Sequence, residues 1–291
     1  MNVLSLFDGM SAGMLALERA GIVVSNYYAS EVDKWAIKVS SANYPSIVHI
    51  GDVTKVAYKN GTLYTENGEY NVGKIDLLIG GSPCQSVSNL GDGSGLEGKS
   101  GLFFHYLRIK DEVKPKKFLL ENVVGNKKAI AEMSEMMGVE PKMIDSNLLS
   151  AQNRKRYYWS DIEYDIPTDK GIMLEDILES NPSESSKLSD ARMRWLLSDK
   201  GQATLAKRYA NLDGDKASCL TARSDASWNS NYVTRDGIIT KLTCTEYERL
   251  QTVPEGYTSC VSDSQRYKIL GNGWTVEVIA HIFKGLKKEL A

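Results

Sequence analysis

Up to about residue 160, short apolar or β-branched stretches alternate with longer stretches whose apolar residues recur at helical spacing. We expect strands at 3–7, 27–30, 48–51, 77–80, 118–122, 143–147 and 156–160. Helical patterns occupy 12–21, 33–43, 101–114 and 127–137. This alternation is typical of a parallel sheet with helices on both faces, so the chain is predicted to have an α/β fold.

Two parts of the chain depart from this alternation. Residues 56–73 contain two Asn-Gly pairs and predict a β-hairpin at the edge of the sheet. The alternation lapses after residue 160, and helical patterns return only at 243–251 and 274–290. We therefore expect a large domain over 1–161, a smaller region over 162–241, and a C-terminal segment over 242–291 that completes the large domain.

The composition excludes several classes of protein. The 291 residues are 42% hydrophobic and 25% charged, as in ordinary globular chains. No stretch approaches the roughly 20 consecutive apolar residues of a membrane helix, and the N-terminus has no basic region followed by an apolar one. We therefore expect a cytoplasmic protein without a membrane partner. The four cysteines form no CxxC pair and only three histidines are present, so we expect no metal site and no disulfide framework.

Charge is distributed unevenly along the chain. The net charge of −2 gives no global signature of a nucleic-acid binder. Residues 161–186 nevertheless hold eight acidic side chains and one basic side chain, whereas residues 187–223 hold eight basic and four acidic ones. The second stretch is therefore the better candidate for contact with a polyanion.

Polar residues follow the first three expected strands, where ligands of open α/β sheets bind. Gly9 and Gly13 allow a tight turn at a helix N-terminus, Glu31 follows the second strand, and Asp52 follows the third. A glycine turn can be purely structural, and either carboxylate alone fits a helix cap. Together they favour a nucleoside cofactor, with Glu31 at its ribose and Asp52 at its adenine.

Two further residues have the chemistry of a catalytic site. Cys84 follows "GGSP" after the fourth expected strand and precedes a glycine-rich polar stretch that is typical of a mobile loop. A buried cysteine is usually inert, but a thiol at the root of such a loop is placed for nucleophilic work. Glu121 ends an otherwise apolar strand, so it is either paired or catalytic.

The motifs "FDGMSAG", "GGSPCQ", "ENV", "QNRKRYYW" and "GNGWTVEV" occur in the order and spacing of the DNA (cytosine-5) methyltransferases, which the chain resembles over about 1–160 and 242–285. The stretches "VLSLFDG", "ASEV", "GLFF" and "ENVV" are similar to the catalytic domain of the animal de novo enzymes. Gln85 after the cysteine is the residue of bacterial and phage enzymes. The resemblance implies a Rossmann-like S-adenosylmethionine-dependent sheet with a small target-recognition domain. We expect a restriction-modification, orphan or phage member.

The resemblance also implies how the enzyme works. The Cys84 thiolate attacks carbon 6 of a cytosine flipped out of duplex DNA, and Glu121 donates to ring nitrogen N3. Carbon 5 then accepts the methyl group of S-adenosylmethionine. Arg154 and Arg156 hold the cytosine carbonyl, the backbone phosphate or Glu121 itself, with a surface basic cluster as the alternative.

Ligand-binding positions follow from the same resemblance. The implied cofactor-binding residues are Phe7, Asp8, Gly9, Met10, Ser11, Ala12, Glu31, Asp52, Val53, Pro83, Asn272, Gly273 and Trp274. The implied DNA-binding residues are Gln85, Ser88, Gln152 and Arg223. Glu246 and Arg249 are expected to brace the recognition region.

Sequence specificity is predicted from "ASCLTARSDAS", which resembles the recognition loop of the de novo enzymes. Arg223 is expected to bond O6 and N7 of a guanine beside the target cytosine, with CpG as the favoured site and a longer site containing it as the alternative. Arg223 could instead bind phosphate. A tRNA-modifying member of the family and a catalytically inactive regulatory subunit are the alternative functions, and a monomer is expected.

Overall fold

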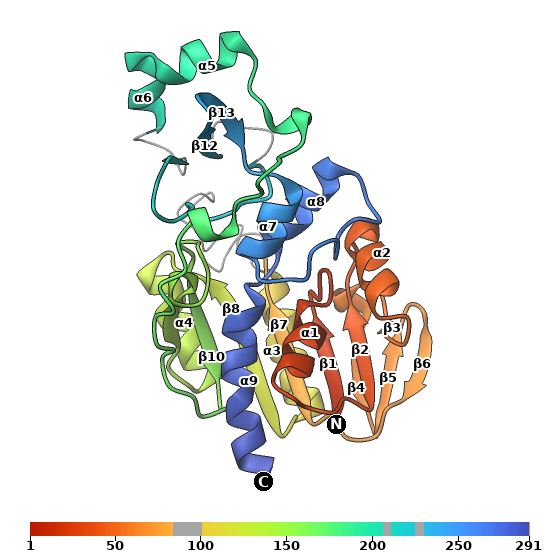
Figure 1. Cartoon of the computed structure of the whole chain (residues 1–291). Coiled ribbons are helices and arrows are strands. Elements are labelled where there is room, and N and C mark those ends of the chain that lie inside the picture. The colour runs from red at the N-terminus through yellow and green to blue at the C-terminus, as the bar shows by residue number, and fades with distance from the viewer. Residues whose placement is uncertain (84–100, 206–210, 225–229, 291) are drawn as a thin grey trace. The chain divides into compact units, whose positions relative to one another are not determined.

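The computed structural model describes residues 1–83, 101–205, 211–224 and 230–290 (Figure 1). Its contacts divide the chain into two units. Unit 1 comprises Met1–Ile144, Lys155–Ile166 and Val278–Ala291, and unit 2 comprises Asp145–Arg154 and Pro167–Glu277. The described residues contain no helix that is both long and apolar enough to cross a membrane.

The largest element is a seven-stranded sheet with the order β3-β2-β1-β7-β8-β10-β9. Its strands are β1 (Asn2–Leu6), β2 (Asn26–Ser30), β3 (Val48–His49), β7 (Leu77–Gly81), β8 (Lys117–Val123), β9 (Lys142–Asp145) and β10 (Lys155–Ser160). The pairs β1·β2, β2·β3, β1·β7 and β7·β8 are parallel. The α/β fold predicted from the alternation is confirmed.

One strand departs from the predicted parallel sheet, because β10 runs antiparallel to β8. A parallel neighbour needs a crossover connection of about a dozen residues or more. Only residues 146–154 separate β10 from β9, its neighbour on the other side. The length of this connection is the physical reason for the mixed direction.

Helices pack on both faces of this sheet. Unit 1 holds α1 (Ala12–Arg19), α2 (Lys34–Asn43), α3 (Gly101–Val113), α4 (Lys127–Met137) and most of α9 (Val276–Leu290). In Figure 1, α1 and α9 lie in front of the sheet. Leu4 and Leu6 of β1 share a buried core with Phe103 and Tyr106 of α3. Val3 points to the opposite face and is also fully buried, as expected for a strand covered on both sides.

The helix boundaries have local causes. The Asn126 side chain accepts a hydrogen bond from the Lys128 N–H and caps the start of α4. The helix ends at Gly138, whose φ of 71° is left-handed and therefore favours glycine. The sequence pattern predicted these bounds.

The predicted hairpin is a separate three-stranded sheet of β4 (Ala57–Lys59), β5 (Thr62–Thr65) and β6 (Gly68–Asn71). Asn60 and Gly61 have φ values of 50° and 84°, as a type I′ turn requires. The second Asn-Gly pair spans the start of β6, because Gly68 is the first residue of that strand, and Glu66 and Asn67 connect β5 to β6 as a second hairpin. The prediction of a single hairpin was therefore incomplete.

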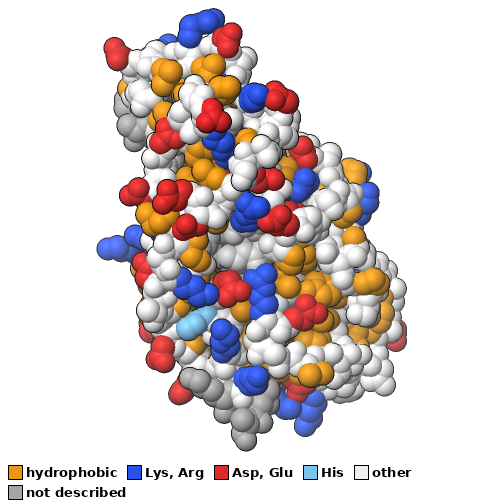
Figure 2. All heavy atoms as spheres, in the orientation of Figure 1, with side chains coloured by type: hydrophobic (Ala, Val, Ile, Leu, Met, Phe, Trp, Pro, Cys, Tyr) orange, Lys and Arg blue, Asp and Glu red, His pale blue; other side chains and the backbone are white. Residues whose placement is uncertain are grey.

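Unit 2 contains a smaller sheet and four short α-helices within its described residues. These are β11 (Asn211–Leu212), β12 (Asn231–Arg235), β13 (Ile238–Lys241), α5 (Asp190–Leu197), α6 (Asp199–Leu205), α7 (Cys244–Leu250) and α8 (Asp263–Asn272). Leu196, Leu205, Tyr232 and Ile239 form part of its core. On the surface drawn in Figure 2, acidic and basic side chains are interspersed, in keeping with the small net charge.

Candidate active site

The turn after β1 has an unusual backbone. Phe7, Gly9 and Ser11 have φ values of 58°, 62° and 60°, all in the left-handed region. The Asp8 N–H donates to the Ser30 carbonyl at 3.1 Å, and the Gly9 N–H donates to the Glu31 carboxylate at 2.8 Å. A Cβ added at Gly9 would meet nothing within 4 Å, so the backbone is uncovered there. These bonds fix the turn against the end of β2 and leave room for a ligand above it.

The Asp8 carboxylate points into the protein beneath this turn. It accepts hydrogen bonds from the Ser11 hydroxyl at 2.5 Å and from the Tyr27 hydroxyl at 2.7 Å. Burial raises the pKa of Asp8 to about 6, although these hydrogen bonds lower it. The side chains of Met10, Ser11 and Ala12 are buried as well. The turn therefore offers a ligand its backbone and the half-buried Phe7 rather than these side chains.

Glu31 and Asp52 lie where the second and third strands end. Glu31 accepts hydrogen bonds from the Val32 and Asp33 N–H groups at 2.7 and 2.8 Å, in addition to that from Gly9. Asp52 caps the short 3-10 helix Val53–Lys55 by accepting from the Thr54 N–H, and Val53 is buried. Both carboxylates are therefore held in fixed orientations at the edge where a nucleoside is expected.

Glu121 lies on β8 opposite Gly81, the last residue of β7. Its side chain is buried, and its carboxylate pairs with Arg156 of β10 at 2.9 Å from Nε to Oε1. Asn122 donates to the Ser82 hydroxyl at 3.0 Å and ties β8 to the residues after β7. The structure thus pairs Arg156 with Glu121, which is one of the partners that the resemblance implied for Arg154 and Arg156.

Cys84, Gln85 and Ser88 lie outside the described residues. Pro83 is the last described residue before them and is exposed. In the sequence, Cys84 comes three positions after Gly81, the last residue of β7. Gly81 is the residue of β7 that pairs with Glu121 of β8.

Gln152 and Arg154 belong to unit 2 and are buried, with exposed fractions of 0% and 4%. The Gln152 amide donates to the Leu250 carbonyl and to Gln251 Oε1, both at 3.1 Å. Arg154 donates to the Leu220 carbonyl at 2.8 Å and to the Gly273 carbonyl at 2.9 Å. These contacts are those of bracing residues within unit 2, and the predicted contacts of Gln152 with DNA and of Arg154 with cytosine stay predictions.

Sequence reasoning missed two members of this cluster. Gln251 donates to the Leu270 carbonyl at 2.6 Å, and Thr275 donates to Gln251 Oε1 at 2.9 Å. Thr275 lies within the motif "GNGWTVEV" and Gln251 within the helical pattern 243–251, but neither was singled out, because their partners are distant along the chain. Asn272 and Trp274, predicted to bind cofactor, lie in the same unit at the end of α8. Arg223 is exposed.

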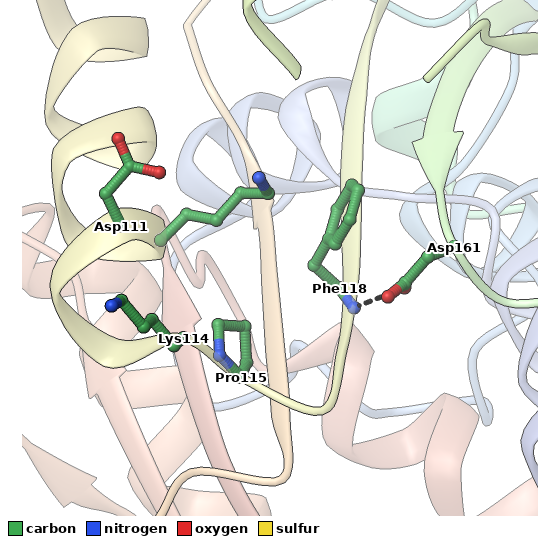
Figure 3. Close-up of a pocket in the computed structure, with 6 residues that line it drawn as sticks. Asp111, Lys114, Pro115, Phe118 and Asp161 are labelled. Carbon is green, nitrogen blue, oxygen red and sulfur yellow. Dashed lines mark hydrogen bonds between the residues drawn. The ribbon is translucent and has the colours of Figure 1, made fainter. Parts of the chain in front are cut away.

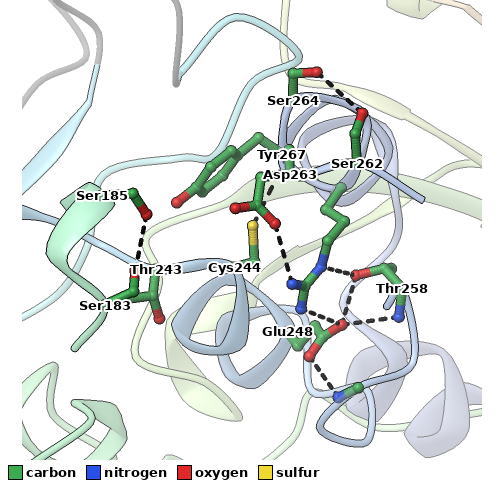
Figure 4. Close-up of polar contacts among 12 residues, drawn as sticks. Ser183, Ser185, Thr243, Cys244, Glu248, Thr258, Ser262, Asp263, Ser264 and Tyr267 are labelled. Atoms are coloured by element: carbon green, nitrogen blue, oxygen red, sulfur yellow. Dashed lines mark hydrogen bonds and ion pairs between the residues drawn. The ribbon is translucent and has the colours of Figure 1, made fainter. Parts of the chain in front are cut away.

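Other polar groups of unit 2 are structural (Figure 4). Glu248 is fully buried and accepts hydrogen bonds from the Thr258 N–H and from Arg266. Glu246, also fully buried, pairs with Arg235 at 2.5 Å. Burial raises the pKa of the Cys244 thiol to about 12, so this cysteine is unsuited to nucleophilic attack at neutral pH.

A hollow of about 400 Å³ lies away from these groups, next to the start of β8. Lys110, Lys114, Phe118 and Asp161 contribute to its lining, and Asp161 accepts a hydrogen bond from the Phe118 N–H at 2.8 Å (Figure 3). Glu121 is near the other end of the same strand, so the hollow is not the candidate active site. The described residues contain no cluster of His, Cys, Asp or Glu suited to a metal ion.

The fold is that of known methyltransferases. The structure matches Entamoeba histolytica methyltransferase EhMeth with a TM-score of 0.77 and 17% identity, over 100% of this chain and 99% of that one. It matches the S. pombe Dnmt2 methyltransferase with a TM-score of 0.74 and 18% identity, over the same shares. A mostly parallel sheet with helices on both faces is the fold of the S-adenosylmethionine-dependent methyltransferases, the class to which these structural neighbours belong.

The family is narrower than the fold. The model of the C-5 cytosine-specific DNA methylases matches residues 1–217 and 219–288, so the chain belongs to this family and is a DNA (cytosine-5) methyltransferase. It is 30% identical to type II methyltransferase M1.ScrFI of Lactococcus lactis subsp. cremoris, over 96% of this chain and 76% of that protein. It is 27% identical to type II methyltransferase M.NlaX of Neisseria lactamica, over 100% and 97%. The family predicted from the motifs is confirmed.

Proposed function

We propose that this enzyme methylates carbon 5 of a cytosine in duplex DNA, with Cys84 as the nucleophile and Glu121 as the acid. The observation that supports this assignment best is the buried Glu121–Arg156 pair, held on the strand beside the one that leads to Cys84. The pair fixes the position of the carboxyl group, and a group that transfers a proton to substrate must lie within hydrogen-bond reach of it.

The proposed chemistry begins at the cysteine. The Cys84 thiolate forms a bond to carbon 6 of the cytosine, and Glu121 gives a proton to N3, which makes carbon 5 electron-rich. When bound, S-adenosylmethionine supplies an electrophilic methyl group. A base then removes the proton from carbon 5 as the bond from carbon 6 to sulfur breaks, which restores the thiolate, and the proton on N3 returns to Glu121. Arg156 keeps the Glu121 carboxyl in one orientation through these steps.

The residues of unit 1 fit the cofactor. The uncovered backbone at Gly9 and the half-buried Phe7 suit a close approach, and the fixed carboxylate of Glu31 suits ribose hydroxyls. Asp52 and Val53 would face the adenine. The motif "GNGWTVEV" implies that Asn272, Gly273 and Trp274 also bind the cofactor.

DNA recognition is assigned to unit 2. Arg223 is exposed on a turn in which the Ser224 N–H donates to the Thr221 carbonyl at 3.1 Å. An exposed arginine can form two bonds to a guanine edge in the major groove, worth roughly 1 to 3 kcal/mol of discrimination. We expect a short target with a guanine beside the methylated cytosine, and CpG is the favoured site. The target base is flipped out of the duplex to reach the cysteine.

The test is methyl transfer from labelled S-adenosylmethionine to duplex DNA and to tRNA. Wild-type protein is expected to label cytosine in duplex DNA, and Cys84→Ala is expected to abolish labelling while leaving the fold intact. Cys260→Ser is the matched control, because Cys260 forms no disulfide bond and belongs to none of the proposed sites, so its loss should leave labelling unchanged. Labelling of tRNA alone, or full activity in Cys84→Ala, would contradict the proposal.

A further inference from the structure

Two side chains of the motif "QNRKR" contact the segment that leads to Arg223. This segment, Cys219–Ser224, is called the recognition loop below. Residues just before it pair with the motif, since the Asn153 N–H donates to the Ala217 carbonyl at 2.8 Å and the Ala217 N–H donates to the Ala151 carbonyl at 2.7 Å. All of these residues belong to unit 2.

Gln152 binds the recognition loop through its side chain. The Leu220 N–H donates to Gln152 Oε1 at 3.0 Å. Both contacts of the Gln152 amide nitrogen go to the end of α7, to the Leu250 carbonyl and to Gln251. The side chain is fully buried, so these bonds are shielded from water. Gln152 therefore links the loop to α7.

Arg154 binds the carbonyl group of the same residue, Leu220. Its Nη1 donates to the Leu220 carbonyl at 2.8 Å, while its Nη2 donates to the Gly273 carbonyl at 2.9 Å. A buried guanidinium needs such partners, because burying a charge without hydrogen bonds is costly. If Arg154 turned toward a phosphate, the carbonyls of Leu220 and Gly273 would lose the hydrogen bonds that Arg154 donates to them.

The recognition loop also packs tightly on the end of α8. A Cβ added at Gly271 would lie 2.2 Å from the Thr221 carbonyl oxygen and 2.7 Å from the Ala222 nitrogen. Only glycine permits this approach. Within the loop, the Thr221 N–H donates to the buried Ser224 hydroxyl at 2.9 Å. Leu220 and Thr221 are thus held by Gln152, by Arg154 and by the end of α8. Arg223 is exposed.

We propose that Gln152 and Arg154 are positioning residues that hold the recognition loop in one conformation and thereby set which base Arg223 selects. This inference rests on the proposed function, in which Arg223 contacts guanine. It replaces the contacts of Gln152 and Arg154 with DNA that the motif implied. Loss of either side chain frees the backbone at Leu220, so it affects discrimination between sequences rather than the chemical step.

The first experiment needs no variant. Amide hydrogen exchange of the wild-type protein is expected to show slow exchange at Leu220, which lies outside any helix or strand, at a rate comparable with the ends of α7. Exchange of the Leu220 amide as fast as that of exposed loop amides would overturn the proposal. Because this measurement uses no DNA, it remains valid if the assignment of Arg223 to guanine fails.

The second experiment measures specificity as the ratio of kcat/KM at the preferred site to that at a site with one base changed. Gln152→Leu, which keeps the bulk of the side chain but loses the bonds to Leu220 and α7, is expected to lower this ratio about tenfold or more. Asn153→Ala is the matched control in the same motif, because its side chain is exposed and accepts a hydrogen bond from Asn147. An equal fall of kcat/KM at all sites in Gln152→Leu would overturn the proposal.

The third experiment separates positioning from phosphate binding. Arg154→Met should leave the salt dependence of DNA binding unchanged, whereas removal of a phosphate contact lowers the slope by about 1. Arg154→Lys keeps the charge but cannot span both carbonyls, so it is expected to lose specificity like Gln152→Leu. A reduced slope in Arg154→Met together with normal specificity in Arg154→Lys would overturn the proposal. Arg223→Ala tests the guanine contact separately, since an unchanged sequence preference there refutes that assignment alone.

Discussion

At the scale of single residues, the buried carboxyl of Asp8 makes stability depend on pH. Its pKa is about 6 in the folded protein against an ordinary value of 3.8, so the native state binds more protons between these values. Stability contributed by the protonated form is therefore lost as pH rises through about 4 to 6. A shift of about two pKa units corresponds to roughly 3 kcal/mol.

The variant Asp8→Asn removes this titration. The difference in free energy of unfolding between Asp8→Asn and wild type is expected to change by roughly 3 kcal/mol in favour of the variant as pH rises from about 4 to about 7. Urea unfolding at a series of pH values measures the difference. A constant difference across that range would show that Asp8 does not titrate there.

Glu121 is expected to act on the chemical step. Glu121→Gln keeps the size of the side chain and an oxygen that can accept from Arg156, but it has no acidic proton to give. We expect kcat to fall about 10²-fold or more while the Kd for DNA stays nearly constant. Single-turnover kinetics and binding titrations measure the two quantities. Equal losses in both would indicate a structural carboxylate.

The residues also show where sequence reasoning stops. Glu121 was predicted from its place at the end of an apolar strand, and the sequence left open whether it is paired or catalytic. The contacts of Arg154 could not be predicted, because its carbonyl partners Leu220 and Gly273 are 66 and 119 positions away. A sequence does not show which backbone carbonyls an arginine contacts. An arginine that binds carbonyls therefore cannot be distinguished in the sequence from one that binds DNA.

At the scale of elements, the start of α7 depends on one side chain. Thr243 and Glu246 form a reciprocal capping box, and the Thr243 hydroxyl also bonds Glu179. Thr243→Ala is expected to lower the free energy of unfolding by roughly 1 to 2 kcal/mol. Ser262→Ala is the matched control, because Ser262 precedes α8 but makes no capping bond with its side chain. Denaturant unfolding measures both, and equal small losses would contradict the cap.

Elements with regular apolar spacing were predicted well. The direction of a strand, which depends on its neighbours in the sheet, was not. Helix α4 has regular apolar spacing between Asn126 and Gly138, so its bounds were predicted. The direction of β10 depends on which strand it meets, and a single strand has no sequence signal for this. Helices α5 and α6 were missed because few of their residues are apolar and buried, and α8 was missed because its buried residues all come after its first turn.

At the scale of the whole molecule, DNA binding must rely on local charge. The exposed Arg194 of α5 lies within the basic stretch 187–223, whereas Lys170 lies within the acidic stretch 161–186. Arg194→Gln is expected to reduce the slope of log affinity against log salt by about 1, and Lys170→Gln should leave it unchanged. Binding titrations at several salt concentrations decide, and equal slopes in both variants would exclude Arg194 as a phosphate contact.

The division of the chain into catalytic and recognition parts at 161 and 241 stays a prediction. The motifs identified the family because they are spread along the chain in a fixed order, so they did not depend on domain boundaries.

The central claim is that Cys84 forms a covalent bond with the target cytosine. DNA with 5-fluorocytosine at the target position tests it, because fluorine cannot leave carbon 5 as a proton does and the adduct persists. With S-adenosylmethionine present, mass spectrometry of the wild-type protein is expected to show a protein–DNA adduct attached at Cys84, and Cys84→Ala is expected to show none. An adduct in Cys84→Ala, or methyl transfer by wild type without any adduct, would contradict the account.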